Sequence, residues 1–496
     1  MIMSHDLGTT GNKATLVGPA GEVIASYTAR YSSDFGEGGK AEQDPLSWWL
    51  AVCVASKELL NQVKGESAGV DAVAFSGQMM GAVLLDKDMS LVRPAIIWAD
   101  TRASVQAAEL SDRIGLDRGY KITGHRFNAT YSLPKVMWVR DNEPDVFQRV
   151  RHVTCAKDYI AYMLTGVLAT DPSDASGTNA FDQVKSQWSD EIFSAAGLDH
   201  LFPEVVPSTA VIGSVTKDAA ASTGLRAGTP VVIGGGDGPM AALGSGVIDS
   251  SSGAYTYLGS SSWVSLATSA PIHDPGMRTM TFSHVVPNQY VPTATMQAGG
   301  ASLQWISEVL EPTDDNSYED LINEAFDAQA AAEDLYFLPH LLGERSPYWN
   351  PNARGAFVGI SRHHTRGNLV RAVIEGIAFN LLSGIRAFTA NGADIPEIDA
   401  IGGAANSQKL LSIFANIWGL QIHQRSLADE ATSLGAAIVG GVGIGFFDSF
   451  LISKRLSTNL QSIRPNPLSL ERASTQFDRF LDAYSRMEPW FDRRPG

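Results

Sequence analysis

The sequence predicts an α/β protein made of two related halves that face a shared deep cleft. With 496 residues, the chain is too long for a single ordinary hydrophobic core. Short apolar runs with strand character alternate with segments of helical periodicity, and this pattern restarts near residue 250. Hydrophobic residues make up 44% and charged residues 18% of the chain, which is typical of a protein that folds throughout.

Strands and helices alternate through the first half of the chain. The expected strands are Met1–His5, Ala14–Val17, Val23–Tyr27, Val70–Phe75, Ala82–Leu85, Ala95–Trp98 and Pro230–Ile233. The expected helices are Leu46–Val63, Leu133–Arg140 and Asp158–Leu164. The segment Thr170–Ser186 is rich in Ser, Asp, Gly and Asn, and we expect a loop or a short hairpin there.

The second half repeats the opening pattern of the first. Tyr257-Leu-Gly-Ser-Ser-Ser-Trp-Val264 parallels Asp6-Leu-Gly-Thr-Thr-Gly-Asn-Lys13, because in both an apolar strand leads into glycine, paired hydroxyl residues and another strand. An internal duplication explains the parallel and predicts domains of residues 1–247 and 248–496. The other elements expected in this half are strands at Gly253–Leu258, Val264–Ala267 and Ile398, and helices at Lys409–Trp418 and 430–445.

The composition argues against several classes of protein. A net charge of −16 without a Lys/Arg cluster disfavours binding to nucleic acid or to an anionic membrane. Cys53 and Cys155 show no pairing pattern, so we expect two buried thiols. No secretory signal is visible, and the most apolar run, Leu434–Phe447, is shorter than a membrane span. We therefore expect a cytoplasmic protein.

Two motifs point to phosphoryl transfer. The turn after Asp6 is built from small and hydroxyl residues, whose backbone N–H groups can surround a phosphate. Val231-Val-Ile-Gly-Gly-Gly-Asp237 places one carboxylate after a buried strand, on a triple-glycine turn that a ligand can approach closely. From the residues alone, Asp237 could instead cap a helix over Pro239–Leu243.

A third motif fits a flat ring. In Ile398-Asp-Ala-Ile-Gly-Gly-Ala-Ala-Asn-Ser-Gln408, small residues at a strand-to-helix turn allow a base to lie against the backbone, and Asn406 can form hydrogen bonds with it. The alternative is tight packing of the helix on the strand. Because the net charge repels a nucleotide, its binding would depend on oriented amides and a divalent cation.

Taken in order, these residues resemble the FGGY carbohydrate kinases, from about residue 3 to about residue 480. Ser132-Leu-Pro-Lys-Val-Met-Trp138 and Gly343-Glu-Arg-Ser-Pro-Tyr348 are also similar to family signatures. Within the family the chain is most similar to the xylulokinases, and the motifs that carry this are Ala41-Glu-Gln-Asp-Pro45, Gly77-Gln-Met-Met-Gly81, Trp98-Ala-Asp-Thr-Arg102 and Gly234-Gly-Gly-Asp237. The resemblance implies two duplicated actin-like, ribonuclease H-like ATPase domains, with ATP and Mg²⁺ as the nucleotide and the metal.

The resemblance also assigns roles to residues. Asp237 is the expected catalytic base, and Asp6 and Asp237 are the expected Mg²⁺ ligands. The expected ATP-binding residues are Thr9, Thr10, Gly11, Asn12, Lys13, Gly259, Ser260, Ser261, Gly402, Gly403, Ala404 and Asn406. The expected sugar-binding residues are Gln78, Met79, Met80, Trp98, Asp100, Arg102 and Asp237.

Two departures from the xylulokinase pattern concern the sugar. Met80 stands where many xylulokinases have histidine, and Gly238 stands where they often have asparagine, so two hydrogen-bonding groups are absent. D-xylulose is the expected substrate, and ribulose, another ketopentose, a polyol such as erythritol, or gluconate are the alternatives.

Other functions and properties follow from the same reading. An actin-like or Hsp70-like ATPase would hydrolyse ATP without a sugar, and a silent regulator would bind sugar without consuming ATP. Neither a P-loop nor a Rossmann glycine motif is found in suitable context. We expect hinges near residues 244–256 and 430–470, and a homodimer is possible.

Overall fold

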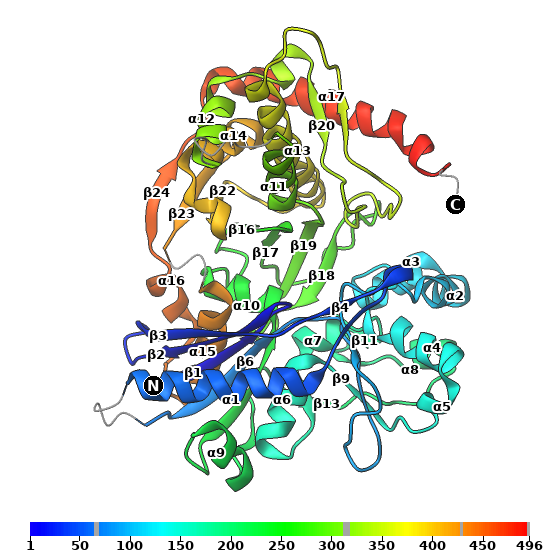
Figure 1. Ribbon diagram of the computed structural model, residues 1–496, viewed down its shortest axis with the longest axis vertical. Coiled ribbons are helices and arrows are strands. Elements are labelled where there is room, and N and C mark those ends of the chain that lie inside the picture. Colours follow the sequence, from blue (N-terminus) through cyan, green and yellow to red (C-terminus); the bar gives the residue numbers. More distant parts are fainter. Residues whose placement is uncertain (64–68, 311–317, 427–429, 494–496) are drawn as a thin grey trace.

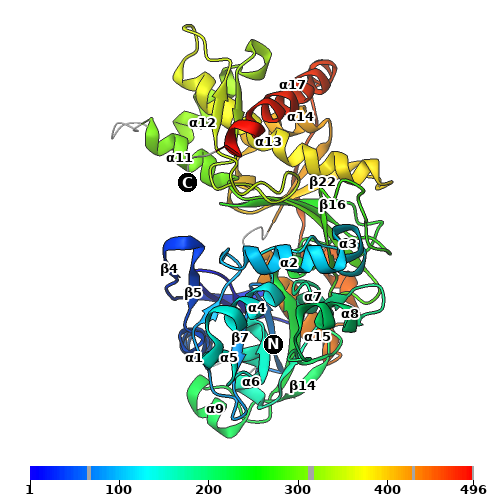
Figure 2. The same ribbon diagram turned by 90° about the vertical axis from the view of Figure 1, so that its right-hand side faces the viewer.

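The computed structural model describes residues 1–63, 69–310, 318–426 and 430–493, which form two lobes (Figure 1). We call the part around a six-stranded sheet the first lobe and the part around a seven-stranded sheet the second lobe. A view turned by 90° shows the second lobe above the first, as in Figure 1 (Figure 2).

The first sheet has the strand order β14-β15-β6-β1-β2-β3. Its strands are β1 (Ile2–Leu7), β2 (Gly11–Val17), β3 (Val23–Arg30), β6 (Ala72–Gly77), β14 (Val211–Ser214) and β15 (Pro230–Gly236). Strand β1 pairs antiparallel with β2 and parallel with β6, and β6 pairs parallel with β15. The carboxyl ends of β1, β6 and β15 therefore meet at one edge of the sheet.

The second sheet repeats this arrangement, in the order β18-β19-β17-β16-β22-β23-β24. Its strands are β16 (Ala254–Leu258), β17 (Ser262–Leu266), β18 (Met280–Ser283), β19 (Tyr290–Met296), β22 (Glu397–Ile401), β23 (Gln421–Arg425) and β24 (Asn459–Ile463). Strand β16 is antiparallel to β17 and parallel to β22, as β1 is to β2 and β6. The repeated pairing supports the predicted duplication.

Helix α1 (Pro45–Gln62) illustrates how the sequence sets a helix and its buried face. Asp44 caps it by accepting a hydrogen bond from the Leu46 N–H at 3.0 Å, and Pro45 supplies the φ angle of the first turn. Trp48, Val52 and Leu59 are buried in the core of the first lobe, where α1 packs on β2 and β3.

Between Ser104 and Gly244, a stretch that the structure describes throughout, the first lobe contains nine further helices, some of which pack on the sheet. They are α2 (Ser104–Ile114), α3 (Leu116–Thr123), α4 (Ser132–Asn142), α5 (Pro144–Phe147), α6 (Ala156–Thr165), α7 (Pro172–Ser176), α8 (Asp190–Ala196), α9 (Lys217–Thr223) and α10 (Asp237–Gly244). Its short strands are β4 (Asp34–Phe35), β5 (Ala41–Gln43), β7 (Val83–Leu85), β8 (Ala95–Ile96), β9 (His152–Thr154), β10 (Ala169–Thr170), β11 (Phe181–Asp182), β12 (Gln187–Trp188) and β13 (Glu204–Val205).

The second lobe has a long central helix, α13 (Arg366–Ala390). Of the helices in the described ranges, it alone is long and apolar enough to cross a membrane, but 89% of its most apolar window is buried within the protein. The other elements of this lobe are α11 (Gly300–Val309), α12 (Tyr318–Asp327), α14 (Gln408–Trp418), α17 (Pro467–Phe491), β20 (Tyr336–Leu338) and β21 (Ala356–Val358). The short helix α16 (Ser453–Leu456) lies in the first lobe, where Leu456 packs against the core cluster and the Ser453 hydroxyl donates to the Leu243 carbonyl. The cytoplasmic location stays a prediction.

Helix α15 (Ala431–Gly443) comes late in the chain but lies in the first lobe (Figure 1). It packs on α10 and on β1, β2, β6 and β15, and Leu434 and Ile438 share a core cluster with Ile2 and Val232. The predicted division into residues 1–247 and 248–496 separates the two sheets, and the second part contributes α15 to the packing of the first sheet. The reason is that small residues on α15 fit the apolar face of the first sheet.

Two local predictions need correction. The segment Thr170–Ser186 contains helix α7 as well as the β11–β12 hairpin, and its residues 170–183 are almost all buried instead of forming a surface loop. The triple glycine is not a turn, because β15 continues to Gly236 through a register shift. Gly234 has a φ of +72°, and a Cβ there would lie 1.9 Å from the Phe75 carbonyl oxygen, so only glycine fits.

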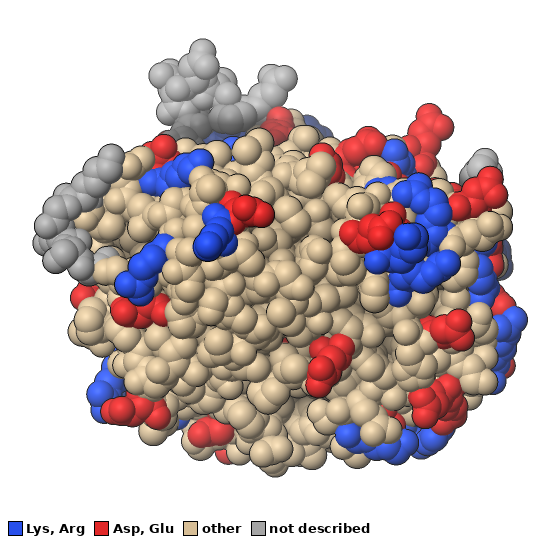
Figure 3. All heavy atoms as spheres, turned by 90° about the horizontal axis from the view of Figure 1, so that it is seen from below, with Lys and Arg blue, Asp and Glu red and all other residues tan. Residues whose placement is uncertain are grey.

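The charges seen on one face are mixed. Viewed from below, the Lys and Arg side chains lie beside Asp and Glu side chains and form no continuous basic area (Figure 3). That the protein binds no nucleic acid stays a prediction.

Candidate functional site

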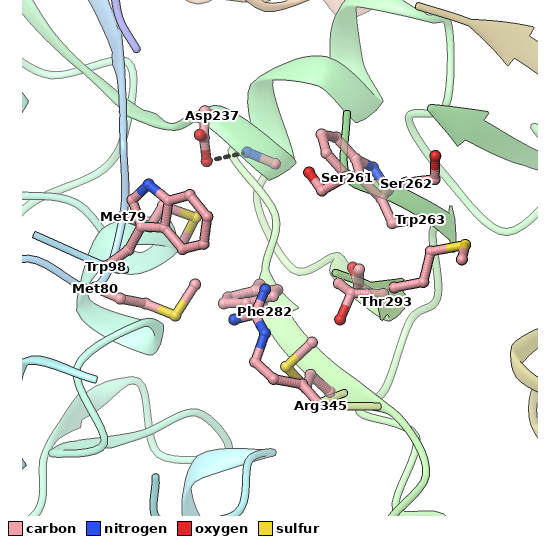
Figure 4. A pocket seen from close by; sticks show the side chains of 14 residues that line it. Met79, Met80, Trp98, Asp237, Ser261, Ser262, Trp263, Phe282, Thr293 and Arg345 are labelled. Atoms are coloured by element: carbon pink, nitrogen blue, oxygen red, sulfur yellow. Dashed lines mark hydrogen bonds between the residues drawn. The ribbon is translucent and has the colours of Figure 1, made fainter. Parts of the chain in front are cut away.

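A pocket lies between the two lobes, with residues of both in its wall (Figure 4). Met79, Met80, Trp98, Asp237 and Gly238 contribute from the first lobe. The second lobe contributes Ser261, Ser262, Trp263, Met280, Phe282, Thr293, Thr295, Met296 and Arg345. The wall is largely apolar and aromatic, with few polar groups, as in many sites for small ligands.

Asp237 stands where β15 ends and α10 begins. Its carboxylate accepts a hydrogen bond from the Gly238 N–H at 2.8 Å, and it is the first residue of α10, so it does not act as the N-cap that the alternative interpretation required. Burial, reinforced by the charge of nearby Asp6, raises the pKa of Asp237 to about 7. A carboxylate with such a pKa can take up a proton near neutral pH.

Asp6 and Asp237 line a second cavity that adjoins the pocket, together with Gly8, Tyr257 and Thr432. The Asp6 Oδ2 accepts a hydrogen bond from the Thr432 hydroxyl at 2.7 Å. Its Oδ1 is buried and has no hydrogen-bond partner among the described residues. Burial also raises the pKa of Asp6. Two half-buried carboxylates, one with a buried oxygen that has no partner among the described residues, fit a hard divalent cation such as Mg²⁺.

The first glycine hairpin is held in place by polar contacts. The Trp98 indole N–H donates to the Thr9 hydroxyl at 2.9 Å, and the Gln43 amide donates to the Thr9 carbonyl at 2.6 Å. Thr10 is exposed at the tip of the hairpin. At Gly11 a Cβ atom would lie only 2.8 Å from the Ala29 carbonyl oxygen, so glycine allows β2 to lie close to β3 there.

The structure places Asn12 and Lys13 on opposite faces of β2. Asn12 is fully buried, and its side-chain amide lies 3.1 Å from the His5 ring, so the side chain points into the core. Lys13 forms an ion pair with Glu430 at 3.2 Å. The reason is strand alternation, which turns the Asn12 side chain to one face of β2 and Lys13 to the other.

Gln78, Asp100 and Arg102 are not among the residues that line the pocket. Gln78 is buried and donates to Gln43 at 2.8 Å. Asp100 accepts from the Ala41 N–H at 2.8 Å and pairs with Arg102 at 2.7 Å, and the Arg102 guanidinium also reaches Glu42. These groups fix the loop that carries Trp98.

Met80 has a strained backbone, with a φ of +63° in a bulky residue. Helix α4 holds it there, because the buried Lys135 ammonium donates to the Met80 carbonyl at 2.7 Å and the Ser132 hydroxyl donates to the Gly81 carbonyl at 2.7 Å. Burial lowers the pKa of Lys135 to about 7. The Ser132–Trp138 motif thus holds the backbone of the pocket residue Met80 and of Gly81 in place.

The second hairpin and the third motif lie together in the second lobe. Gly259 and Ser260 accept hydrogen bonds from Gly300 and Ala301 at the start of α11, at 2.8 and 3.0 Å. Gly402 has a φ of +92°, and a Cβ there would lie 2.8 Å from the Leu258 carbonyl oxygen. A cavity beside it is lined by Gly403, Ala404 and Asn406, with Glu319, Asn323 and Lys409.

Arg345 was missed by residue-level prediction, although it lies in a motif that the sequence singled out. It comes from the second lobe, and its guanidinium lies 6.0 Å from the centre of the Trp98 ring of the first lobe. Its Nε and Nη1 are buried without hydrogen-bond partners among the described residues. Burial lowers the pKa of Arg345, because the nearby negative charges do not fully offset the cost of removing the cation from water. The wall residues Met280, Phe282, Thr293 and Thr295 had no signal in the sequence.

Known proteins resemble the chain over nearly its whole length. Residues 1–244 match the N-terminal domain and residues 254–444 the C-terminal domain of the FGGY family of carbohydrate kinases. A xylulose kinase of Staphylococcus epidermidis is 33% identical over 452 residues, which are 90% of this chain and 88% of that protein.

Solved structures agree with this. Ligand-bound xylulose kinase from Lactobacillus acidophilus has a TM-score of 0.94 at 26% identity and covers 99% of both chains. Gluconate kinase from the same organism has a TM-score of 0.92, also at 26% identity, and covers 98% of both chains.

Proposed function

Because the chain belongs to the FGGY family of carbohydrate kinases, which use ATP, we propose that it phosphorylates a primary hydroxyl of a ketopentose, with D-xylulose as the leading substrate. The observation that carries the proposal is the position of Asp237, a carboxylate at the junction of the pocket and the Asp6 cavity. The similarity to xylulose kinases over 90% of the chain supports the sugar.

In this mechanism Asp237 accepts the proton of the sugar hydroxyl as its oxygen attacks the γ-phosphorus in line. A pKa of about 7, caused by burial and by Asp6, matches that task. The N–H groups of the two glycine hairpins hold the phosphates from opposite lobes, and the cavity at Gly403, Ala404 and Asn406 takes the adenosine.

Asp6 and Asp237 would hold Mg²⁺, since Asp6 keeps one buried oxygen without a partner. When bound, the ion would neutralise part of the negative charge of the ATP phosphates. The chain's own residues orient the sugar: Trp98 offers a flat face to its C–H groups, and Met79 and Met80 keep water from the attacking oxygen.

A second candidate substrate is a sugar acid. The Arg345 guanidinium has two buried nitrogens without partners, and a carboxylate is the group that such a fork pairs with best. The similarity to the Lactobacillus acidophilus gluconate kinase supports this candidate.

The test is ADP release from Mg·ATP with a panel of ketopentoses, aldoses, polyols and sugar acids. We expect turnover with one class and a loss of about 10²–10⁴-fold in kcat for Asp237→Asn, because the general base is removed while the binding surface stays. Maximal turnover with D-xylulose supports the leading substrate, and maximal turnover with gluconate supports the second.

Asp117→Asn is the control, because Asp117 lies outside both cavities and is exposed on helix α3, where it pairs with Lys121. Sugar-independent hydrolysis that depends on Asp237 would contradict a sugar kinase and indicate an ATPase switch. Sugar binding without ADP release would indicate a regulator instead.

A further inference from the structure

A buried segment of the first lobe, Asp171–Gly177 with helix α7, lies directly behind the pocket. Asp171 caps α7 and is completely buried. The helix packs against both β15 of the first lobe and β18 of the second. None of the roles assigned above uses this segment, although it contacts the backbone on both sides of the pocket.

A chain of hydrogen bonds runs from Asp171 to the residue before the catalytic base. The Asp171 Oδ2 accepts the Ser173 hydroxyl at 2.6 Å. The Ser173 Oγ in turn accepts the backbone N–H of Gly236 at 2.9 Å. Gly235 permits this approach, because a Cβ there would lie 2.6 Å from the Ser173 Oγ. Gly236 precedes Asp237 and is the last residue of β15.

A buried cation holds Asp171 from the other side. The Lys157 Nζ lies 3.1 Å from the Asp171 Oδ1, 3.1 Å from Asp174 and 2.5 Å from Asp158, and all four side chains are at most 1% exposed. Burial disfavours the Lys157 cation, but the three carboxylates outweigh it and raise its pKa well above the ordinary value. Burial raises the pKa of Asp174 well above its usual range. The Asp171 carboxylate is thus compensated within the cluster.

The same segment touches other parts of the pocket. The Ser176 hydroxyl accepts the N–H of Ser283, which follows the wall residue Phe282, at 3.1 Å. A Cβ on Gly177 would lie 3.2 Å from Met79 and 3.4 Å from Met80. Because interiors are close-packed, a shift of α7 must move these walls and the end of β15 together.

We propose that Ser173, oriented by the Asp171–Lys157 pair, is a positioning residue for the transfer step, which it serves by fixing the Gly236 N–H and thereby the place of the Asp237 carboxylate. The inference rests on the proposed role of Asp237 as the base. The Ser173 hydroxyl donates to a carboxylate and accepts from an amide, so these two hydrogen bonds fix both its position and its orientation. Such a group can hold the backbone at Gly236 to within a fraction of an ångström.

The test compares Ser173→Ala with Ser208→Ala. Both hydroxyls donate to the same Asp171 Oδ2, at 2.6 and 2.7 Å, but only Ser173 accepts the Gly236 N–H. We expect Ser173→Ala to lower kcat by about 10- to 100-fold with KM for sugar and ATP changed less than about twofold, since a misplaced base affects the transition state alone. Ser208→Ala should keep kcat within about twofold of the unchanged protein.

A second substitution covers the case in which Ser173→Ala does not fold. Ser173→Cys fills a similar space but replaces the oxygen by a weak acceptor, so we expect the same selective loss in kcat. Thermal unfolding of all three variants separates this effect from general destabilisation. Equal kcat values for the Ser173 and Ser208 variants overturn the inference.

The two proposals fail in different ways. If Asp237→Asn keeps full sugar-dependent turnover, the proposed base is wrong whatever Ser173 does. If Asp237→Asn is inactive and the Ser173 variants match Ser208→Ala, the base stands and the positioning role is wrong.

Discussion

Single buried residues carry much of the chemistry of this protein, and their protonation follows from their hydrogen bonds. His284 is an example outside the pocket. Its Nε2–H donates to the Val247 carbonyl at 2.9 Å, and its Nδ1 accepts the Val286 N–H at 3.3 Å, so both nitrogens are used by the neutral ring. Burial lowers the pKa of His284 to about 4.

This residue should make stability depend on pH. The unfolded chain takes up a proton on His284 below its ordinary pKa of about 6.5, and the folded protein does so only near 4, so the free energy of unfolding falls as the pH drops between these values. We expect His284→Gln to reduce the loss between pH 7 and pH 5 by about 2 kcal/mol, measured by urea unfolding. His200→Gln, at an exposed histidine, is the control, and an equal pH dependence in both variants would contradict the assignment.

At the scale of elements, the sequence predicted best where a periodic pattern coincides with a core. Strands β1, β3 and β16 and helices α1, α4 and α14 lie within a few residues of their predicted bounds. Helix α7 was missed because its five residues are too short for a periodic signal and its polar composition is typical of loops. Its polar groups are satisfied by partners far away in the chain, which no local pattern reveals.

The same limit applies to the site. Asp237 and Ser261, which belong to glycine motifs, and Trp98, which belongs to one of the expected sugar-binding motifs, all line the pocket. The hairpin motif does not say which of its side chains turn inward, and the Asn12 side chain is one that does. Arg345 was missed because its neighbour in the pocket, Trp98, lies in the other lobe and far away in the sequence.

Helix α4 offers a test of how one element supports another. Lys135→Met removes the ammonium that holds the Met80 carbonyl, so the strained backbone of Met80 can relax. We expect KM for the sugar to rise about 10- to 150-fold while KM for ATP stays unchanged, since a lost hydrogen bond from a charged group is worth about 1.5–3 kcal/mol. Steady-state kinetics measures both constants.

Lys121→Met is the matched control, because Lys121 is an exposed lysine of helix α3 that pairs only with Asp117 on the same helix. If both lysine variants shift KM for the sugar equally, Lys135 has no specific role at Met80.

At the scale of the whole molecule, the predicted fold class of two duplicated actin-like domains is confirmed by the family match and by the structural neighbours. Within the described residues, the chain passes from the first lobe to the second between α10 and β16 and again between α15 and β24, while β23 of the second lobe precedes α15 in the sequence. These crossings fall near the predicted hinges. Closure of the lobes stays a prediction.

The contact between α10 and α15 should be sensitive to any added volume. A Cβ on Gly435 would lie 2.2 Å from the Met240 carbonyl oxygen, so Gly435→Ala forces the two helices apart. We expect the free energy of unfolding to fall by about 1–3 kcal/mol, the usual effect of overpacking. Thermal or urea unfolding measures this, with the exposed Gly69→Ala as control, since no atom of the described residues lies within 4 Å of a Cβ at Gly69. Equal stability of the two variants would contradict the close contact.

The late position of α15 has a consequence for synthesis on the ribosome. The first lobe is made early, yet the helix that covers β6 and β15 emerges only after residue 430. Until then Ile2, Ala74 and Val232 remain open to solvent or to other chains. We therefore expect a chain that stops before residue 431 to leave this apolar face uncovered and to aggregate instead of forming a stable first lobe.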